Sequence, residues 1–238
     1  MRAAERASGP PALSLLRRGE VRVLGRLPWS SNHGVLVTVG DGAEELGAVY
    51  KPLRGERPLW DYPPGLHRRE AAVYAVSAAL GWDLVPETVV RDGPFGPGSF
   101  QRFVPAELSE HYYTLLERPE HHPRLLALAV LDVVVNSGDR KAGHCLLGTD
   151  GRVWAIDNGL SLHAEPKLRT VIWDFGGRPV PEALVADVAR LAGGLPPSLE
   201  GLLEPRERQA LTDRAGALAA RPVLPRLRSP RDWPWPLV

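Results

Sequence analysis

The feature that most constrains the fold is the segment 136–159, which reads NSGDRKAGHCLLGTDGRVWAIDNG. It contains a polar loop, two short apolar stretches at 145–147 and 153–156, and a final Asp-Asn-Gly. The glycine-rich turn between the apolar stretches predicts a β-hairpin. Because a hairpin brings its two ends together, we expect it to place Asp139 and Asp157 on one side of the fold.

Phosphoryl transfer from ATP needs two acids in such an arrangement, one near the accepting hydroxyl and one holding a divalent metal. Asp139 follows a glycine in a loop and would orient the acceptor or take its proton. Asp157 ends the apolar strand VWAID and would hold the metal. The alternatives are structural: Asp139 would cap a turn or pair with Arg140, and Asp157 would start the Asp-Asn-Gly turn.

Lysine is scarce in this chain, so each one is informative. Lysine and arginine together number 29, and only Lys51, Lys141 and Lys167 are lysines. A lysine retained against such a bias indicates a place where a compact ammonium is needed. Lys51 ends a predicted strand, and Glu70 lies early in the helix that follows. This order fits a phosphate-binding lysine held by a glutamate, against the alternative of two unrelated surface charges.

Three further groups are candidates. Lys141 would stabilise the transferring group. His144 would be a second metal ligand or a phosphate contact, in which case manganese should outperform magnesium and activity should fall below about pH 6.5. Hydroxyl and backbone N–H groups of the turn between the first two strands would cover the phosphates, although an ordinary hairpin turn fits equally; these residues are Ser30, Ser31 and Asn32.

The pattern along the chain predicts an α+β fold with two lobes, a small β-rich lobe at 13–105 and a mostly helical lobe at 106–238. In addition to the two short hairpin strands, alternating and β-branched stretches predict strands at 20–27, 34–39, 46–52, 85–91 and 99–104. Helical spacing predicts helices at 66–80, 124–135, 182–192 and 205–220. We expect residues 1–12 to be frayed and the proline-rich end to lie extended, pinned by Trp233 and Trp235.

Composition limits the partners. A net charge of +1 disfavours nucleic acid and anionic membranes as partners reached by bulk electrostatics. The longest apolar stretch, 125–135, is too short to span a bilayer, and the single cysteine fits a reducing compartment. We therefore expect a monomeric cytoplasmic protein with no integral membrane segment.

The chain resembles the phosphatidylinositol 3-/4-kinase-like branch of the protein-kinase fold in the order of VYKP, a helix with Glu70, GSFQRFV, NSGDRKAGH and VWAIDNG. It resembles an actinobacterial family of that branch more closely, from about Glu20 to Leu211. The closer likeness lies in LPWSSN, AVYKPLRGERPLWDYP, ALGWDLVPETVVRDGPFGPGS, DRKAGH and EPKLRTVIWDF. It implies a two-lobed protein-kinase-like fold that uses ATP with Mg or Mn.

The resemblance also implies roles for single residues. Lys51 would bind phosphate with Glu70 as its partner, Asp139 would be the catalytic acid, Asp157 would hold metal, and the adenine-holding hinge would lie near Phe103 and Val104. The chain departs from the wider pattern at three positions: His144 stands where Asn is usual, Lys141 where lipid kinases carry His, and Asn158 where Phe follows the metal-binding Asp. A phosphoinositide substrate is not implied.

The leading hypothesis is therefore an ATP-dependent phosphotransferase acting on a hydroxyl of a protein or small molecule. We expect the segment 159–170 to border the acceptor, where Lys167 and Arg169 suggest an anion. Transfer of AMP instead of phosphate is a variant of this hypothesis. The alternatives are a nucleotide-binding pseudokinase acting as a sensor or scaffold, and a metal-dependent hydrolase using Asp139, His144, Asp157 and perhaps His163.

Overall fold

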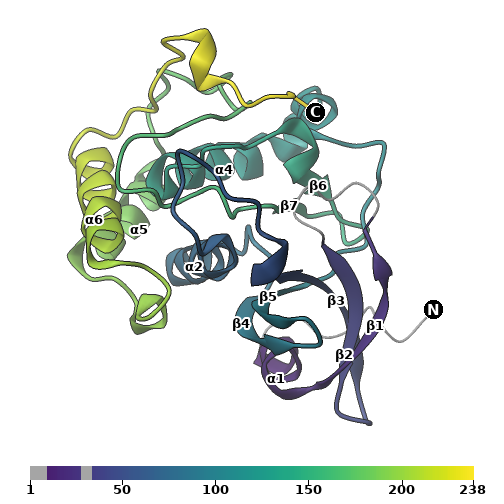
Figure 1. Cartoon of the computed structure of the whole chain (residues 1–238). Helices are drawn as coiled ribbons and strands as arrows, with labels where there is room; N and C mark the ends of the chain where they lie inside the picture. Colours follow the sequence, from purple (N-terminus) through teal and green to yellow (C-terminus); the bar gives the residue numbers. More distant parts are fainter. Residues whose placement is uncertain (1–9, 28–33) are drawn as a thin grey trace.

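A five-stranded antiparallel sheet occupies one end of the molecule, and helices α4, α5 and α6 occupy the other (Figure 1). The computed structural model describes residues 10–27 and 34–238. In chain order, the larger sheet contains β1 (Glu20–Arg26), β2 (Val35–Gly40), β3 (Glu45–Pro52), β4 (Thr88–Gly93) and β5 (Gly96–Arg102). The helices are α1 (Pro10–Arg18), α2 (Leu66–Leu80), α3 (Tyr112–Leu116), α4 (His122–Val135), α5 (Glu182–Gly193) and α6 (Pro205–Ala220).

Strand β3 lies at the centre of the sheet, whose order is β1-β2-β3-β5-β4. Its burial alternates, with Leu46, Ala48 and Tyr50 buried in the core of the sheet. Because successive side chains of a strand point to opposite faces, Lys51 lies on the other face from Tyr50. The strand therefore directs its lysine away from its own apolar core.

The first helix was not predicted. Residues 10–12, expected to be frayed, belong to α1, and its side chains Ala12, Leu15 and Leu16 are buried in the core of the sheet. These three positions have the i, i+3, i+4 spacing of an amphipathic helix. A nine-residue helix is marginal alone, so packing against the sheet stabilises it.

Other boundaries differ by a few residues from the predicted ones. β4 begins at Thr88 and not at residue 85, because Pro86 has no N–H for a strand ladder. β5 begins at Gly96, so the β4–β5 turn is tighter than predicted. Helix α3 was missed. The predicted helix at 66–80 is confirmed, and it ends at Gly81, whose φ of 73° is a left-handed cap.

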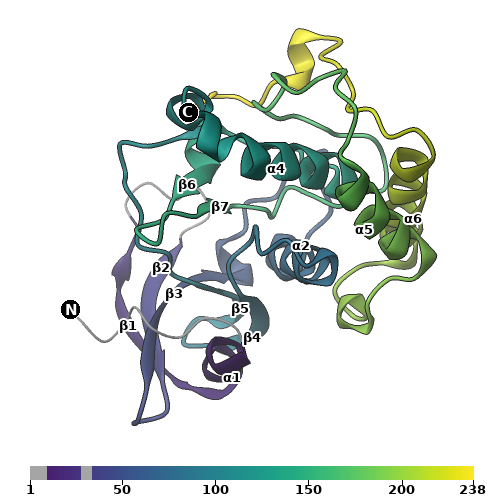
Figure 2. The same cartoon turned by 180° about the vertical axis from the view of Figure 1, so that it is seen from behind.

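The larger apolar core belongs to the helical part of the molecule. It contains buried residues of α4, α5 and α6, and also Ala72, Val73 and Val76 of α2. Helix α2 lies between the sheet and the other helices in both views (Figures 1 and 2). The assignment of α2 to the smaller lobe, and of the lobe boundary to residue 105, stays a prediction.

A small two-stranded sheet lies beside α4, and it brings the loop that contains Asp139 close to the segment that contains Asp157. Its strands are β6 (Cys145–Leu147) and β7 (Val153–Ala155), paired from Cys145 with Ala155 to Leu147 with Val153. The predicted hairpin is thus confirmed. Its two ends lie together, with the loop before β6 next to the Asp-Asn-Gly that follows β7.

The C-terminal tail runs back over the helical part to the N-terminal end of α4 (Figure 1). Trp233 and Leu237 pack against the larger core, whereas Trp235 is 86% exposed. The expectation that Trp235 pins the tail is therefore wrong, because Leu237 occupies the apolar surface instead. Its carbonyl accepts a hydrogen bond of 2.7 Å from the N–H of Ala142. Within residues 10–27 and 34–238, no helix is long and apolar enough to cross a membrane.

Candidate functional site

Lys51 is the point at which the two parts of the molecule meet. Its Nζ donates to the Glu70 carboxylate on α2 and lies 2.8 Å from Asp157 Oδ1 beyond β7. Burial disfavours the ammonium, but the charges of Asp157 and Glu70 outweigh this effect and raise the pKa of Lys51. The lysine is therefore charged at neutral pH.

Glu70 is almost fully buried, with 3% of its side chain exposed. One carboxylate oxygen accepts from Lys51, and the other accepts the backbone N–H of Asn158 at 2.9 Å. A buried carboxylate is stable only when its oxygens are paired in this way. Glu70 therefore joins the strand that carries Lys51 to the segment that carries Asp157.

Asp157 follows β7 with a φ of 55°, in the left-handed region where Asp is among the few tolerated residues. Lys51 lowers the pKa of this carboxyl. Its side chain keeps 36% of its surface exposed, so one side of the carboxylate remains accessible. Asp157 is thus ionised and has room for a further cation.

His144 faces the same carboxylate from the loop before β6. Its Nε2 lies 3.4 Å from Asp157 Oδ2, and its Nδ1 lies 3.0 Å from the backbone oxygen of Asp139. Nδ1 also lies 3.3 Å from the N–H of Lys141. In the tautomer in which Nδ1 accepts that N–H, Nε2–H donates to Asp157; in the tautomer in which Nδ1–H donates to Asp139 O, Nε2 keeps its lone pair, as metal-binding histidines do. Burial lowers the pKa of His144 to about 4, so the ring is neutral at physiological pH.

Asp139 lies beside this group. Burial raises the pKa of Asp139 to about 6, against the opposing charge of Lys141, whose Nζ lies 3.4 Å from Asp139 Oδ2. The charge of Asp157 also contributes to the raised pKa, as expected for two carboxylates that share one region. A carboxylate with a pKa near 6 is well matched to proton transfer near neutral pH.

The structure therefore brings together six of the predicted site residues. They form a continuous group through direct contacts and shared backbone bonds: Lys51, Glu70, Asp139, Lys141, His144 and Asp157. Phe103 and Val104 follow β5, and among the described residues they form no hydrogen bond with the side chains of this group. Phe103 N–H donates to Gly47 O at 2.8 Å, and its side chain is 40% exposed. Ser30, Ser31 and Asn32 lie outside the described residues.

A buried ion pair beneath the site was missed by the sequence reasoning. Arg140 does not pair with Asp139, the structural alternative considered for that residue; it points inward to Asp132 of α4, 3.0 Å away, and both side chains are at most 1% exposed. Arg140 also donates to Ile156 O at 2.8 Å and to Asn158 Oδ1 at 2.6 Å. The sequence feature that could have predicted this ion pair is Asp132, because a charged residue within an apolar helix requires a buried partner.

This ion pair fixes the geometry of the site. Arg140 holds the loop of Asp139 against the segment of Asp157, and Asn158 connects both to Glu70. The result is a chain of polar contacts that runs from Asp132 in the helical part to Lys51 in the sheet. Such a network restricts the positions that the acids can occupy.

His144 and Asp157 are the residues suited to hold a metal. In the described part of the chain, no three His, Cys, Asp or Glu side chains form a metal-binding group. Mg²⁺ in kinase-type sites takes one or two protein ligands and fills its remaining positions with water and phosphate oxygens. The pair formed by His144 and Asp157 fits that number of protein ligands.

Two solved structures resemble the fold. They are a proinflammatory kinase of Helicobacter pylori, CtkA, with a TM-score of 0.50 and 11% identity, and a hydra Fam20 structure with sugar, with a TM-score of 0.57 and 12% identity. The matches cover 88% of this chain and 94% of CtkA, and 92% of this chain and 90% of Fam20. The class is therefore that of kinase-like, two-lobed α+β folds, as the sequence predicted; at this identity the likeness concerns the fold alone.

A closer relative exists by sequence. The chain is 39% identical over 261 residues to Protein Rv2133c of Mycobacterium tuberculosis, in a match that covers 94% of each chain. The chain belongs to the family of that mycobacterial protein. No protein-family model matches this chain.

Proposed function

We propose that this protein is an ATP-dependent phosphotransferase that acts on a hydroxyl of a small molecule or protein. The observation that carries the proposal is the position of Lys51 Nζ between Glu70 and Asp157, with His144 and Asp139 next to them. Phosphoryl transfer requires this set: a cation for the phosphates, a carboxylate for the metal and a second carboxylate for the acceptor.

The roles follow from the contacts. Lys51, held by Glu70, would bind the phosphates, and Asp157 with His144 would hold Mg²⁺ or Mn²⁺. The metal would neutralise charge on the transferring group. Asp139 would orient the acceptor hydroxyl and accept its proton, while Lys141, 3.4 Å from Asp139, would face the transferring phosphoryl group.

The remaining parts of the proposal rest on the resemblance to phosphatidylinositol 3-/4-kinase-like proteins. In this proposal the sheet lobe covers the phosphates with Ser30, Ser31 and Asn32, and adenine lies beside Phe103 and Val104 at the boundary between lobes 13–105 and 106–238. The protein would act as a cytoplasmic monomer. Its single cysteine, Cys145, is buried and free, which fits a reducing compartment.

A direct test measures ATP binding with Mg²⁺ and with Mn²⁺ by calorimetry, followed by transfer of label from the γ position. We expect metal-dependent binding and labelled product, with Mn²⁺ more effective than Mg²⁺ because imidazole is a better ligand for manganese. Binding without transfer of label from either the γ or the α position would identify a pseudokinase instead, whereas transfer from the α position alone would identify AMP transfer. Absence of binding with either metal would refute all three.

The pH dependence of transfer should report on Asp139. A base must be deprotonated, and the pKa of Asp139 is raised to about 6. We therefore expect kcat/KM to be level above pH 7 and to fall below pH 6, by about tenfold per pH unit. A profile recorded from pH 4.5 to 8 at constant ionic strength checks this prediction.

The variant His144→Asn is the control for that profile. The sequence alone suggested that His144 would cause a decline below pH 6.5, but burial lowers its pKa to about 4, so that expectation is corrected. The variant should keep the midpoint near pH 6. If the fall in kcat/KM near pH 6 disappeared in His144→Asn, the group responsible for that fall would be His144 and not Asp139.

A further inference from the structure

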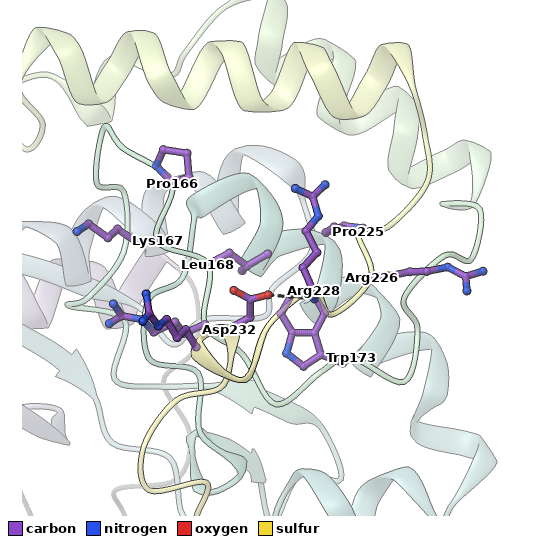
Figure 3. Close-up of a pocket in the computed structure, with 10 residues that line it drawn as sticks. Pro166, Lys167, Leu168, Trp173, Pro225, Arg226, Arg228 and Asp232 are labelled. Atoms are coloured by element: carbon purple, nitrogen blue, oxygen red, sulfur yellow. Dashed lines mark hydrogen bonds between the residues drawn. The ribbon is translucent and has the colours of Figure 1, made fainter.

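A cavity of about 420 Å³ lies between the segment after Asp157 and the C-terminal tail. Lys167, Trp173, Arg226 and Arg228 line it (Figure 3), and so do Arg169 and Arg231. Its volume is within the range of roughly 300–1,000 Å³ typical of small-molecule sites. The function proposed above assigns it no role.

The cavity adjoins the loop that carries Asp139. The N–H of Arg169 donates to Ser137 O at 2.7 Å, and the N–H of Arg140 donates to Arg169 O at 3.0 Å. These two bonds are on either side of Asp139 in the chain. The N–H of Thr170 donates to Asp232 O at 3.1 Å, which attaches the tail to the same segment. The segment that lines one side of the cavity is therefore hydrogen-bonded directly to the loop that carries Asp139.

Positive charge dominates the walls. In the part of the chain that the structure describes, the guanidinium groups of Arg226, Arg228 and Arg231 pair with no carboxylate. Lys167 and Arg169 share the single carboxylate of Asp61, at 3.9 and 3.6 Å. Unpaired arginines around a cavity attract anions and bind phosphate oxygens in pairs.

The cavity also contains one acid. Asp232 lies near its centre in Figure 3, and its Oδ2 accepts the N–H groups of Arg228 at 3.1 Å and Ser229 at 3.0 Å. This carboxylate is thus used to close a turn of the tail.

We propose that this cavity binds the anionic group of the phosphoacceptor, and that the group is a phosphate ester. This inference rests on the proposed function. The acceptor would carry both a phosphate, held by the arginines of the tail, and a hydroxyl directed to Asp139. A phosphorylated sugar or polyol has this chemistry, and so does the headgroup of a phosphorylated lipid.

The test uses the full chain saturated with a non-hydrolysable ATP analogue and Mg²⁺, so that the triphosphate site is filled. Glucose 6-phosphate is titrated in by calorimetry, and phosphatidylcholine vesicles with and without phosphatidylinositol phosphate are used in a sedimentation assay. The pocket variant is Arg228→Gln with Arg231→Gln. Arg206→Gln with Arg221→Gln removes the same charge from other exposed positions.

We expect the pocket variant to weaken binding by about tenfold or more, since a hydrogen bond to a charged group contributes at least that much. The control variant should bind like the unaltered protein. Binding of the sugar phosphate identifies a soluble acceptor, and binding only to the phosphorylated vesicles identifies a lipid headgroup.

Two results would overturn the inference: no binding of either probe, or equal losses in the pocket and control variants. Both leave the proposed function intact if the ATP analogue still binds. Failure of the analogue to bind, measured first and separately, would instead count against the proposed function.

Discussion

Replacing Lys51 by alanine lowers the rate of phosphate transfer by about 100- to 1000-fold, the usual cost of removing one preorganised electrostatic group. Lys51 Nζ contacts both Glu70 and Asp157, so its loss removes a phosphate-binding cation and the counter-ion of two acids. Lys51→Arg should not restore the rate, because a planar guanidinium does not fit a site shaped for an ammonium. Steady-state and single-turnover assays measure the effect.

Arg22→Ala is the matched control for this variant. Arg22 pairs with Glu45 at 3.1 Å on the same sheet, but both side chains are at least half exposed. Exposed pairs contribute little, so its rate and melting temperature should remain close to those of the unaltered protein. Thermal unfolding of Lys51→Ala separates a catalytic loss from a folding defect. A transfer rate equal to that of Arg22→Ala would remove Lys51 from the mechanism.

Replacing Arg140 by methionine lowers the free energy of unfolding by about 3–5 kcal/mol, because it leaves the buried carboxylate of Asp132 without its cation. Thr170 Oγ1 still donates to that carboxylate at 3.0 Å, but one neutral hydroxyl cannot replace a guanidinium. Urea denaturation followed by fluorescence measures the difference.

Two companion variants make this result specific. Arg140→Met combined with Asp132→Asn should recover part of the loss, since a neutral amide costs less to bury than a carboxylate. Arg190→Met removes an arginine from the exposed Arg190–Asp187 pair and should change stability by at most about 1 kcal/mol. If Arg140→Met were no more destabilising than Arg190→Met, the ion pair would not hold the site together.

Local pattern was sufficient to predict the elements that carry the site. The helix 66–80 has helical spacing and a terminal glycine, and the hairpin has a glycine-rich turn between short apolar strands; both are confirmed. The order of Lys51, Glu70, Asp139 and Asp157 along these elements predicted their convergence. Each of these inferences depends on residues near one another in sequence or on a connection that a hairpin fixes.

Tertiary contacts explain what the sequence did not reveal. Arg140 was considered a partner for its neighbour Asp139, yet it reaches Asp132 on α4, and only the packed structure determines which acid it meets. The cavity beside Arg169 needs residues of the tail about 60 positions later in the chain, which no local pattern connects. Helix α1 depends in the same way on the sheet that it covers.

Helix α2 has a consequence for how such a molecule can change shape. Arg69 pairs with Glu207 of α6, and the apolar residues of α2 share the core of the helical part, so α2 is tied to that side. An outward swing of this helix alone would break a buried ion pair and open an apolar core. Because α2 also packs against β4 and β5, a rotation of the sheet relative to the helical part would have to change the Lys51–Glu70 contact, which links β3 to α2.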